Sequence, residues 1–195
     1  RKDRRPPHRA GSGTQTILGP EAPTVSLNRL QSGIGTLVCE AVCSPAVGDV
    51  RLGAAYQLGD GTSSIVQHSS GMSAAPAGSK RPVIAGSRES YDRLTIDLRQ
   101  SRALTRMLVY AFSESGQRIG WGGTLRCSTF GGARIELPLE LGVHQGPVAL
   151  LSLYNVDGQY VLRAETELID GEVREAAHAF GYDRITWADH RTPVQ

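Results

Sequence analysis

Short apolar runs separated by turn residues dominate the pattern of hydrophobic and polar positions along the chain. Residues 104–112 and 148–154 are apolar at almost every position, which is typical of strands buried on both faces. Leu94, Ile96 and Leu98 alternate with polar residues, which predicts a strand with one buried face. The pattern therefore predicts β structure over most of the chain.

Turn residues between the apolar runs indicate antiparallel hairpins. Asp-Gly pairs stand at 60–61 and 157–158, and such pairs favour the positive φ angles of a tight type I′ turn. Gly-Gly at 131–132 and Ser-Gly at 115–116 mark two further turns. The sequence thus carries four hairpin signals.

The segment before Gly181 has helical spacing. Its apolar residues fall at i, i+3, i+4 and i+7: Val173, Ala176, Ala177 and Phe180. Asp170 is the expected N-cap of this helix. Together with the strands, the helix predicts an all-β fold: a two-sheet antiparallel β-sandwich with a short C-terminal helix.

Three segments are expected along the chain. Residues 1–21 lack a hydrophobic period and are rich in Pro, Gly, Ser and Arg, which predicts a disordered basic tail or linker. Residues 22–190 form the expected sandwich domain, and residues 191–195 a C-terminal tail. The tail at 1–9 holds five basic residues and one acid, so contact with phosphates or an acidic membrane surface would be weak and salt-dependent.

Composition narrows the classes of protein. The 195 residues are 39% hydrophobic with a formal charge of +2, which fits one soluble domain. No apolar run reaches the roughly 18–20 residues of a transmembrane segment, and no basic face with aromatic spacing indicates specific nucleic-acid binding. The odd number of cysteines (Cys39, Cys43 and Cys127) argues against a disulfide framework and for a cytoplasmic location.

Catalytic signatures such as GxSxG, HExxH or a phosphate-binding loop do not occur in the sequence, so we expect no enzyme. Acidic residues in turns are the remaining candidates for chemistry: Asp49, Asp60, Glu89 and Asp92. Ca²⁺ takes six to eight oxygen ligands, and the loops of a sandwich are suited to assemble them. Each of the four acids is equally consistent with an ordinary turn or surface charge.

Residues 48–61, GDVRLGAAYQLGDG, resemble the signature of the TerD family, the tellurium-resistance and stress-response domain. That signature opens a strand with Asp-Leu-Asp and continues through small residues and an aromatic to a Leu before an Asp-Gly turn. The matching positions are Asp49, Leu52, Gly53, Tyr56, Leu58, Asp60 and Gly61. Segments similar to other parts of the family follow in order across residues 24–190.

The resemblance implies a bacterial, cytoplasmic stress-response protein without catalysis that binds Ca²⁺ in loops at one end of a sandwich. Two features depart from the family pattern. Arg51 replaces the second aspartate, and the second acidic loop is shortened to residues 85–92. We therefore expect a degenerate calcium site in which Arg51 stands in for the ion and holds Asp49 together with Glu89 or Asp92. The alternative is that Arg51 extends into water.

The functional prediction is a binding or scaffold domain of tellurite-resistance type with a protein partner. Two alternatives remain open at this point. One is an enzyme whose site is assembled from loop residues, and the other is a regulatory domain tethered by its basic tail.

Overall fold

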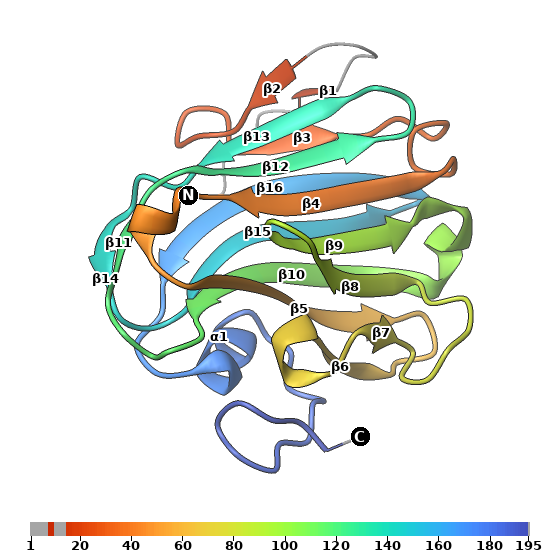
Figure 1. Cartoon of the computed structure of the whole chain (residues 1–195). Coiled ribbons are helices and arrows are strands. Elements are labelled where there is room, and N and C mark those ends of the chain that lie inside the picture. Colours follow the sequence, from red (N-terminus) through yellow and green to blue (C-terminus); the bar gives the residue numbers. More distant parts are fainter. Residues whose placement is uncertain (1–7, 10–14, 195) are drawn as a thin grey trace.

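Two large β-sheets packed face to face form the body of the molecule, as the computed structural model shows for residues 8–9 and 15–194 (Figure 1). Sheet I has the strand order β1-β3-β16-β15-β10-β5-β6, and sheet II has the order β2-β13-β12-β4-β9-β8-β7. A small separate sheet pairs β11 with β14. The predicted β-sandwich with one short C-terminal helix is confirmed.

The elements have the following bounds. Sheet I contains β1 (His8–Arg9), β3 (Thr24–Ser26), β16 (Gln159–Leu168), β15 (Val148–Val156), β10 (Leu104–Ser113), β5 (Val50–Leu58) and β6 (Ser63–Val66). Sheet II contains β2 (Gln15–Ile17), β13 (Arg134–Pro138), β12 (Thr124–Thr129), β4 (Thr36–Val42), β9 (Asp92–Asp97), β8 (Ile84–Arg88) and β7 (Ala74–Ala75). The small sheet contains β11 (Ile119–Trp121) and β14 (Gly142–His144), and the helices are α1 (Val173–Ala179) and the 3₁₀ turns η1 (Pro45–Val47), η2 (His68–Ser70) and η3 (Leu98–Ala103).

Three of the four predicted hairpins form. The turns at 60–61, 131–132 and 157–158 join β5 to β6, β12 to β13 and β15 to β16. The fourth prediction was wrong, because β11 after the turn at 115–116 pairs with β14 and not with β10. Two edge pairs, β1–β3 and β2–β13, are parallel, so the sandwich is not purely antiparallel.

Part of the predicted disordered tail belongs to the sandwich. β2 pairs with β13 and forms the edge of sheet II, and the Leu18 N–H donates to the Glu136 carbonyl at 2.9 Å. The Leu18 side chain is buried in the core between the sheets. Three residues are too few to show a hydrophobic period, so the sequence pattern did not reveal this strand. Residues 1–7 and 10–14 of the predicted tail lie outside the described residues.

The burial of Leu18 gives a prediction. We expect Leu18→Ala to lower the free energy of unfolding by about 2 kcal/mol, at the low end for a core leucine because a short edge strand can close part of the cavity. Ile17→Ala is the matched control, since Ile17 is exposed and the change should stay within about 0.5 kcal/mol. Urea denaturation measures both. Equal midpoints for the two variants would show that β2 is not docked.

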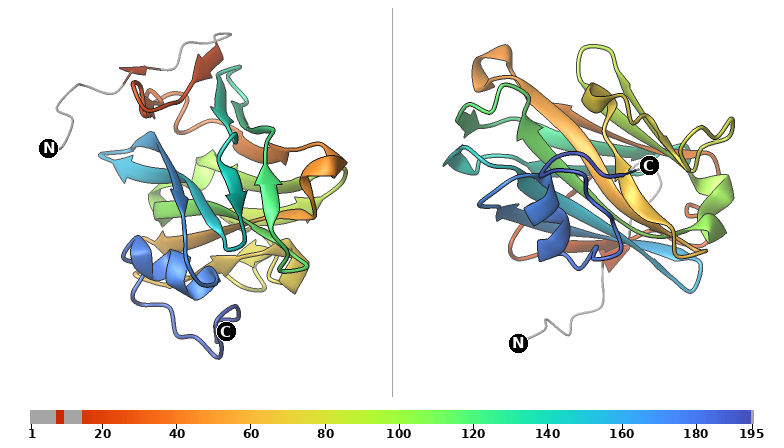
Figure 2. Two further views of the ribbon diagram at one scale, coloured as in Figure 1. Left: turned by 90° about the vertical axis from the view of Figure 1, so that its left-hand side faces the viewer. Right: turned by 90° about the horizontal axis from the view of Figure 1, so that it is seen from below.

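Two apolar layers stabilise the fold. The larger lies between the sheets, and the second lies on the outer face of sheet I beneath α1 (Figure 2). Val173, Ala176 and Ala177 are buried as predicted, while Phe180 at the end of the helix is only half-buried. The N-cap is Glu172 and not Asp170, because Glu172 and Glu175 form a capping box. Within the described part of the chain, no helix has the length and apolar character needed to cross a membrane.

Loops gather at the two ends of the sandwich (Figure 1). At one end β4 finishes, β5 begins at Val50 and β8 turns into β9. At the other end β12 turns into β13 near Phe130, and η3 crosses from sheet II to sheet I. We call these the Asp49 end and the Phe130 end.

Candidate functional site

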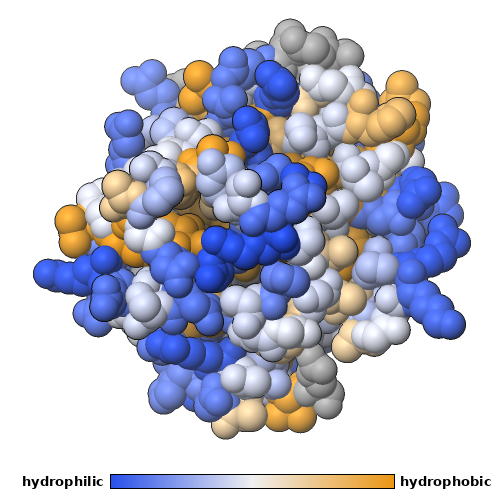
Figure 3. All heavy atoms as spheres, in the orientation of Figure 1, coloured by the Kyte–Doolittle hydropathy of each residue, from blue (hydrophilic) through white to orange (hydrophobic). Residues whose placement is uncertain are grey.

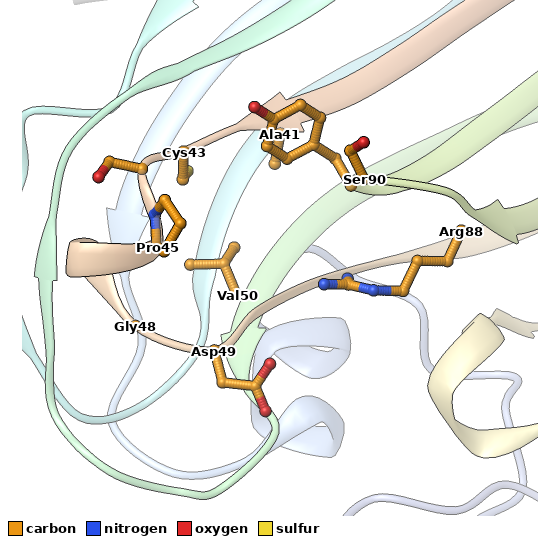
Figure 4. Close-up of a pocket in the computed structure, with 10 residues that line it drawn as sticks. Ala41, Cys43, Pro45, Gly48, Asp49, Val50, Arg88 and Ser90 are labelled. Atoms are coloured by element: carbon orange, nitrogen blue, oxygen red, sulfur yellow. The ribbon is translucent and has the colours of Figure 1, made fainter.

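A cavity of about 570 Å³ opens at the Asp49 end (Figure 4). Its walls come from residues 41–50, which include the end of β4, the link to β5 and the first residue of β5, and from residues 88–91 at the β8–β9 turn. Ser44 begins the link by accepting a hydrogen bond from the Ala46 N–H, and Gly48 allows the positive φ of 133° at its end. This geometry brings Asp49 to the mouth of the cavity.

Asp49 forms an ion pair with Arg51 on the same side of the chain. The two residues are two positions apart at the start of an extended strand, so their side chains point the same way. Arg51 Nη1 lies 3.0 Å from Asp49 Oδ1. Among the described residues Nη1 has no well-aligned hydrogen-bond acceptor, so the contact is mainly electrostatic. The Arg51 side chain is only 18% exposed, so it does not extend into water.

Asp92 is the most buried acid of the site, with 3% of its side chain exposed. Its Oδ2 accepts a hydrogen bond from the Leu52 N–H at 2.9 Å, and its Oδ1 accepts one from Arg88 Nη1 at 2.9 Å. Arg88 and Asp92 are opposite each other in the β8–β9 hairpin. Asp92 therefore joins the hairpin of sheet II to the first turn of β5 in sheet I.

The four predicted metal ligands do not form one cluster. Asp49 and Asp92 both lie beside the start of β5, whereas the Glu89 side chain is 80% exposed and its carboxylate is 3.8 Å from Arg93. Asp60 is at the Phe130 end, separated from Asp49 by the nine residues of β5, or about 30 Å. Its Oδ1 accepts a hydrogen bond from the Thr62 N–H, which is an ordinary turn contact. The structure therefore places Asp60 apart from the other three predicted ligands.

Arg51 fulfils half of its expected role. It pairs with Asp49, but the partner of Asp92 is Arg88 and the nearest cation to Glu89 is Arg93. Two arginines, Arg51 and Arg88, thus pair with the two carboxylates that the sequence analysis assigned to Arg51 alone. The role of Arg88 was not predicted from the sequence, because its contact with Asp92 depends on the register of the β8–β9 hairpin. Opposite charges at 88 and 92 flank a three-residue loop, and that spacing is a signal for a direct cross-strand pair.

The residues present do not fit a calcium ion. Both oxygens of Asp92 are already bound, and one oxygen of Asp49 faces a guanidinium. Ca²⁺ needs six to eight oxygen ligands, and two permanently charged guanidinium groups beside the carboxylates would repel it. No group of three or more His, Cys, Asp or Glu side chains within the described ranges is placed to hold a metal.

Cys43 is the one thiol that lines the cavity. Burial raises the pKa of the Cys43 thiol, so it stays protonated near neutral pH. A protonated thiol is a poor nucleophile, so Cys43 is not activated for covalent chemistry at neutral pH. Arg88 extends from β8 across the start of β5 and supplies a donor at the wall (Figure 4).

No family model matches the chain, and no curated protein matches it. The resemblance to the TerD family therefore rests on residues 48–61 and on the order of the similar segments across residues 24–190.

Proposed function

We propose that this chain is a non-catalytic binding or scaffold domain of TerD type in a cytoplasmic stress response. In this proposal fixed ion pairs replace the calcium ion of the family, and the domain acts by binding a protein partner. The observation that carries the proposal is the pair of contacts at the Asp49 end, Arg51–Asp49 and Arg88–Asp92. They lie where the signature strand begins, which is where the family resemblance implies the ion.

Carboxylates gathered at one end of a sandwich repel each other unless a cation lies between them. A guanidinium supplies that cation permanently and needs no ion from solution. Asp92 also links the two sheets through the Leu52 N–H, so the end of the sandwich is held in one arrangement. A domain fixed in this way fits constitutive binding better than a calcium switch.

Substitution of Arg51 tests this proposal. Arg51→Asp should lower the free energy of unfolding by about 1–2 kcal/mol without calcium, because the new carboxylate faces Asp49. Added Ca²⁺ should then raise the melting temperature of this variant, since an ion that binds the native state alone stabilises it. Thermal unfolding with and without CaCl₂ measures the effect, and calorimetry should show no calcium binding to the unchanged chain.

Arg51→Gln is the matched control, since it removes the cation and adds no ligand. It should lose some stability and gain no response to calcium. Tight calcium binding by the unchanged chain would contradict the proposal. The proposal would also be contradicted if the Arg51→Asp variant were as stable as the unchanged chain and if CaCl₂ did not change its melting temperature.

A further inference from the structure

Exposed apolar side chains stand at the tips of two touching loops at the Phe130 end. Phe130 in the β12–β13 turn is 78% exposed, and Leu30 in the loop before β4 is 70% exposed. Ile34, also exposed, follows in the same loop. Figure 3 shows an apolar patch at the upper right, over the β12–β13 turn and the loop before β4. We call Leu30, Ile34 and Phe130 the apolar tip.

The loop that carries Leu30 is well packed and not loosely folded. Asn28 and Gln31 each donate a backbone N–H to the side chain of the other, at 2.9 and 2.8 Å. Ser32 is fully buried and its Oγ accepts a hydrogen bond from the Tyr160 N–H. Polar side chains thus point inward while Leu30 points outward. This is the reverse of the usual arrangement, and an exposed apolar patch of this kind marks an interaction surface.

Contacts with Gly35 and Thr36 hold Phe130 beside the loop that carries Leu30. The Phe130 N–H donates to the Thr36 carbonyl at 3.2 Å, and its side chain lies over Gly35. A Cβ added at Gly35 would be 2.8 Å from the Phe130 Cγ, so the absence of a side chain at Gly35 makes room for the ring. The ring therefore has a defined position on the surface.

Basic side chains outnumber acidic ones around the apolar tip. Leu98 donates its N–H to the Gly35 carbonyl, which places η3 beside the tip, and Gln100 bonds the Arg81 carbonyl, which brings residues 76–83 to the same end. Exposed basic residues at this end include Arg29, Lys80, Arg81, Arg102 and Arg134, together with Arg184 beside Gly61 of the β5–β6 turn. The acidic residues here include Asp60, Asp157 and Asp183, while Asp97 and Arg99 pair with each other.

We propose that the Phe130 end docks on an anionic lipid membrane surface, with Leu30 and Phe130 entering the interface and the surrounding arginines contacting lipid phosphates. Aromatic and aliphatic side chains at loop tips suit the boundary between headgroups and acyl chains. Each basic residue near an anionic leaflet adds to the electrostatic attraction between the protein and the membrane. The surface lies opposite the cavity, so the proposal does not depend on the function proposed for the Asp49 end.

Area and charge disfavour a second copy of the chain as the occupant. A stable protein interface buries about 800 Å² on each partner. The apolar tip offers on the order of 400 Å², judged from the size of such side chains. Two copies meeting at this end would also bring their basic residues together, which costs free energy. An anionic bilayer can accept the apolar side chains of the tip and can also neutralise the positive charge around it.

Flotation of the full chain with lipid vesicles tests the proposal. We expect binding to phosphatidylcholine vesicles that contain about one-quarter phosphatidylserine, weaker binding to pure phosphatidylcholine, and a decrease as salt screens the charges. Phe130→Ser and Leu30→Ser should each weaken binding about tenfold. Val143→Ser is the matched control, because Val143 is exposed at the Asp49 end and its change should have no effect.

A second pair of variants tests how far the basic residues contribute to vesicle binding. Arg29→Gln combined with Arg134→Gln should weaken binding to the mixed vesicles about tenfold. Arg118→Gln, an exposed arginine at the Asp49 end, should leave binding unchanged. If Phe130→Ser fails to fold because its ring covers Gly35, Leu30→Ser decides the question, and thermal unfolding checks both variants.

Several outcomes would overturn the proposal. Failure of the unchanged chain to bind mixed vesicles is one. Binding that survives both tip variants but disappears in salt is another, and it would assign the contact to the basic segment 1–9. Self-association in the ultracentrifuge that Phe130→Ser abolishes, without vesicle binding, would assign the apolar tip to a second copy of the chain.

Discussion

Asp92→Ala is expected to lower the free energy of unfolding by about 3 kcal/mol. The change leaves the buried Leu52 N–H without its acceptor and removes the carboxylate partner of Arg88. An unsatisfied buried donor costs about 1–3 kcal/mol, and breaking a buried ion pair costs about 3–5 kcal/mol. We expect a loss at the lower end of the second range, and not the sum of the two, because Arg88 is partly exposed and can turn to solvent. Urea denaturation at constant slope measures the loss.

Two variants separate the parts of this effect. Asp92→Asn keeps an oxygen for the Leu52 N–H and loses only the charge, so it should cost about 1 kcal/mol. Glu89→Ala removes the other acid of the same turn, whose carboxylate is exposed and loosely paired, and should cost at most about 0.5 kcal/mol. If Asp92→Ala behaved like Glu89→Ala, the link between the two sheets at this end would be refuted.

Local sequence patterns predicted the fold where the interactions are local. The Asp-Gly pair at 157–158 joins neighbouring strands, and its positive φ angles of 52° and 82° are those the turn requires. The helix at 173–179 follows from spacing within one segment. β2 was missed because its stability comes from pairing with β13, more than a hundred residues later, and three residues carry no period of their own.

In the candidate site, too, local contacts were predictable from the sequence and long-range contacts were not. The contact between Asp49 and Arg51 follows from their spacing on one strand, and the sequence predicted it. The choice between Glu89 and Asp92 depends on which acid reaches the Leu52 N–H, forty positions away in the chain. No local pattern contains that information. The apolar tip was also not predicted, because the amino-acid sequence around Leu30 does not indicate that Gln31 and Ser32 are buried while Leu30 is exposed.

The small residues that follow Leu52 in the signature strand have a packing role that a substitution can measure. Gly53 pairs with Tyr110 of β10. A Cβ at Gly53 would meet the Tyr110 hydroxyl and lie 2.7 Å from Cε2 of the ring. Tyr110 has no exposed surface, and its hydroxyl donates a hydrogen bond to the buried Gln67 Oε1 at 2.6 Å. The ring thus has little room to move away.

Gly53→Ala is therefore expected to lower the free energy of unfolding by about 3 kcal/mol, at the upper end for overpacking, because moving the ring also strains the bond to Gln67. Gly120→Ala is the matched control: Gly120 lies in β11, no atom stands within 4 Å of its added Cβ, and the change should stay within about 0.5 kcal/mol. In a Tyr110→Leu background the cost of Gly53→Ala should fall by at least half, as a double-mutant cycle would show. Equal costs in both backgrounds would mean that the ring is not what reserves this position for glycine.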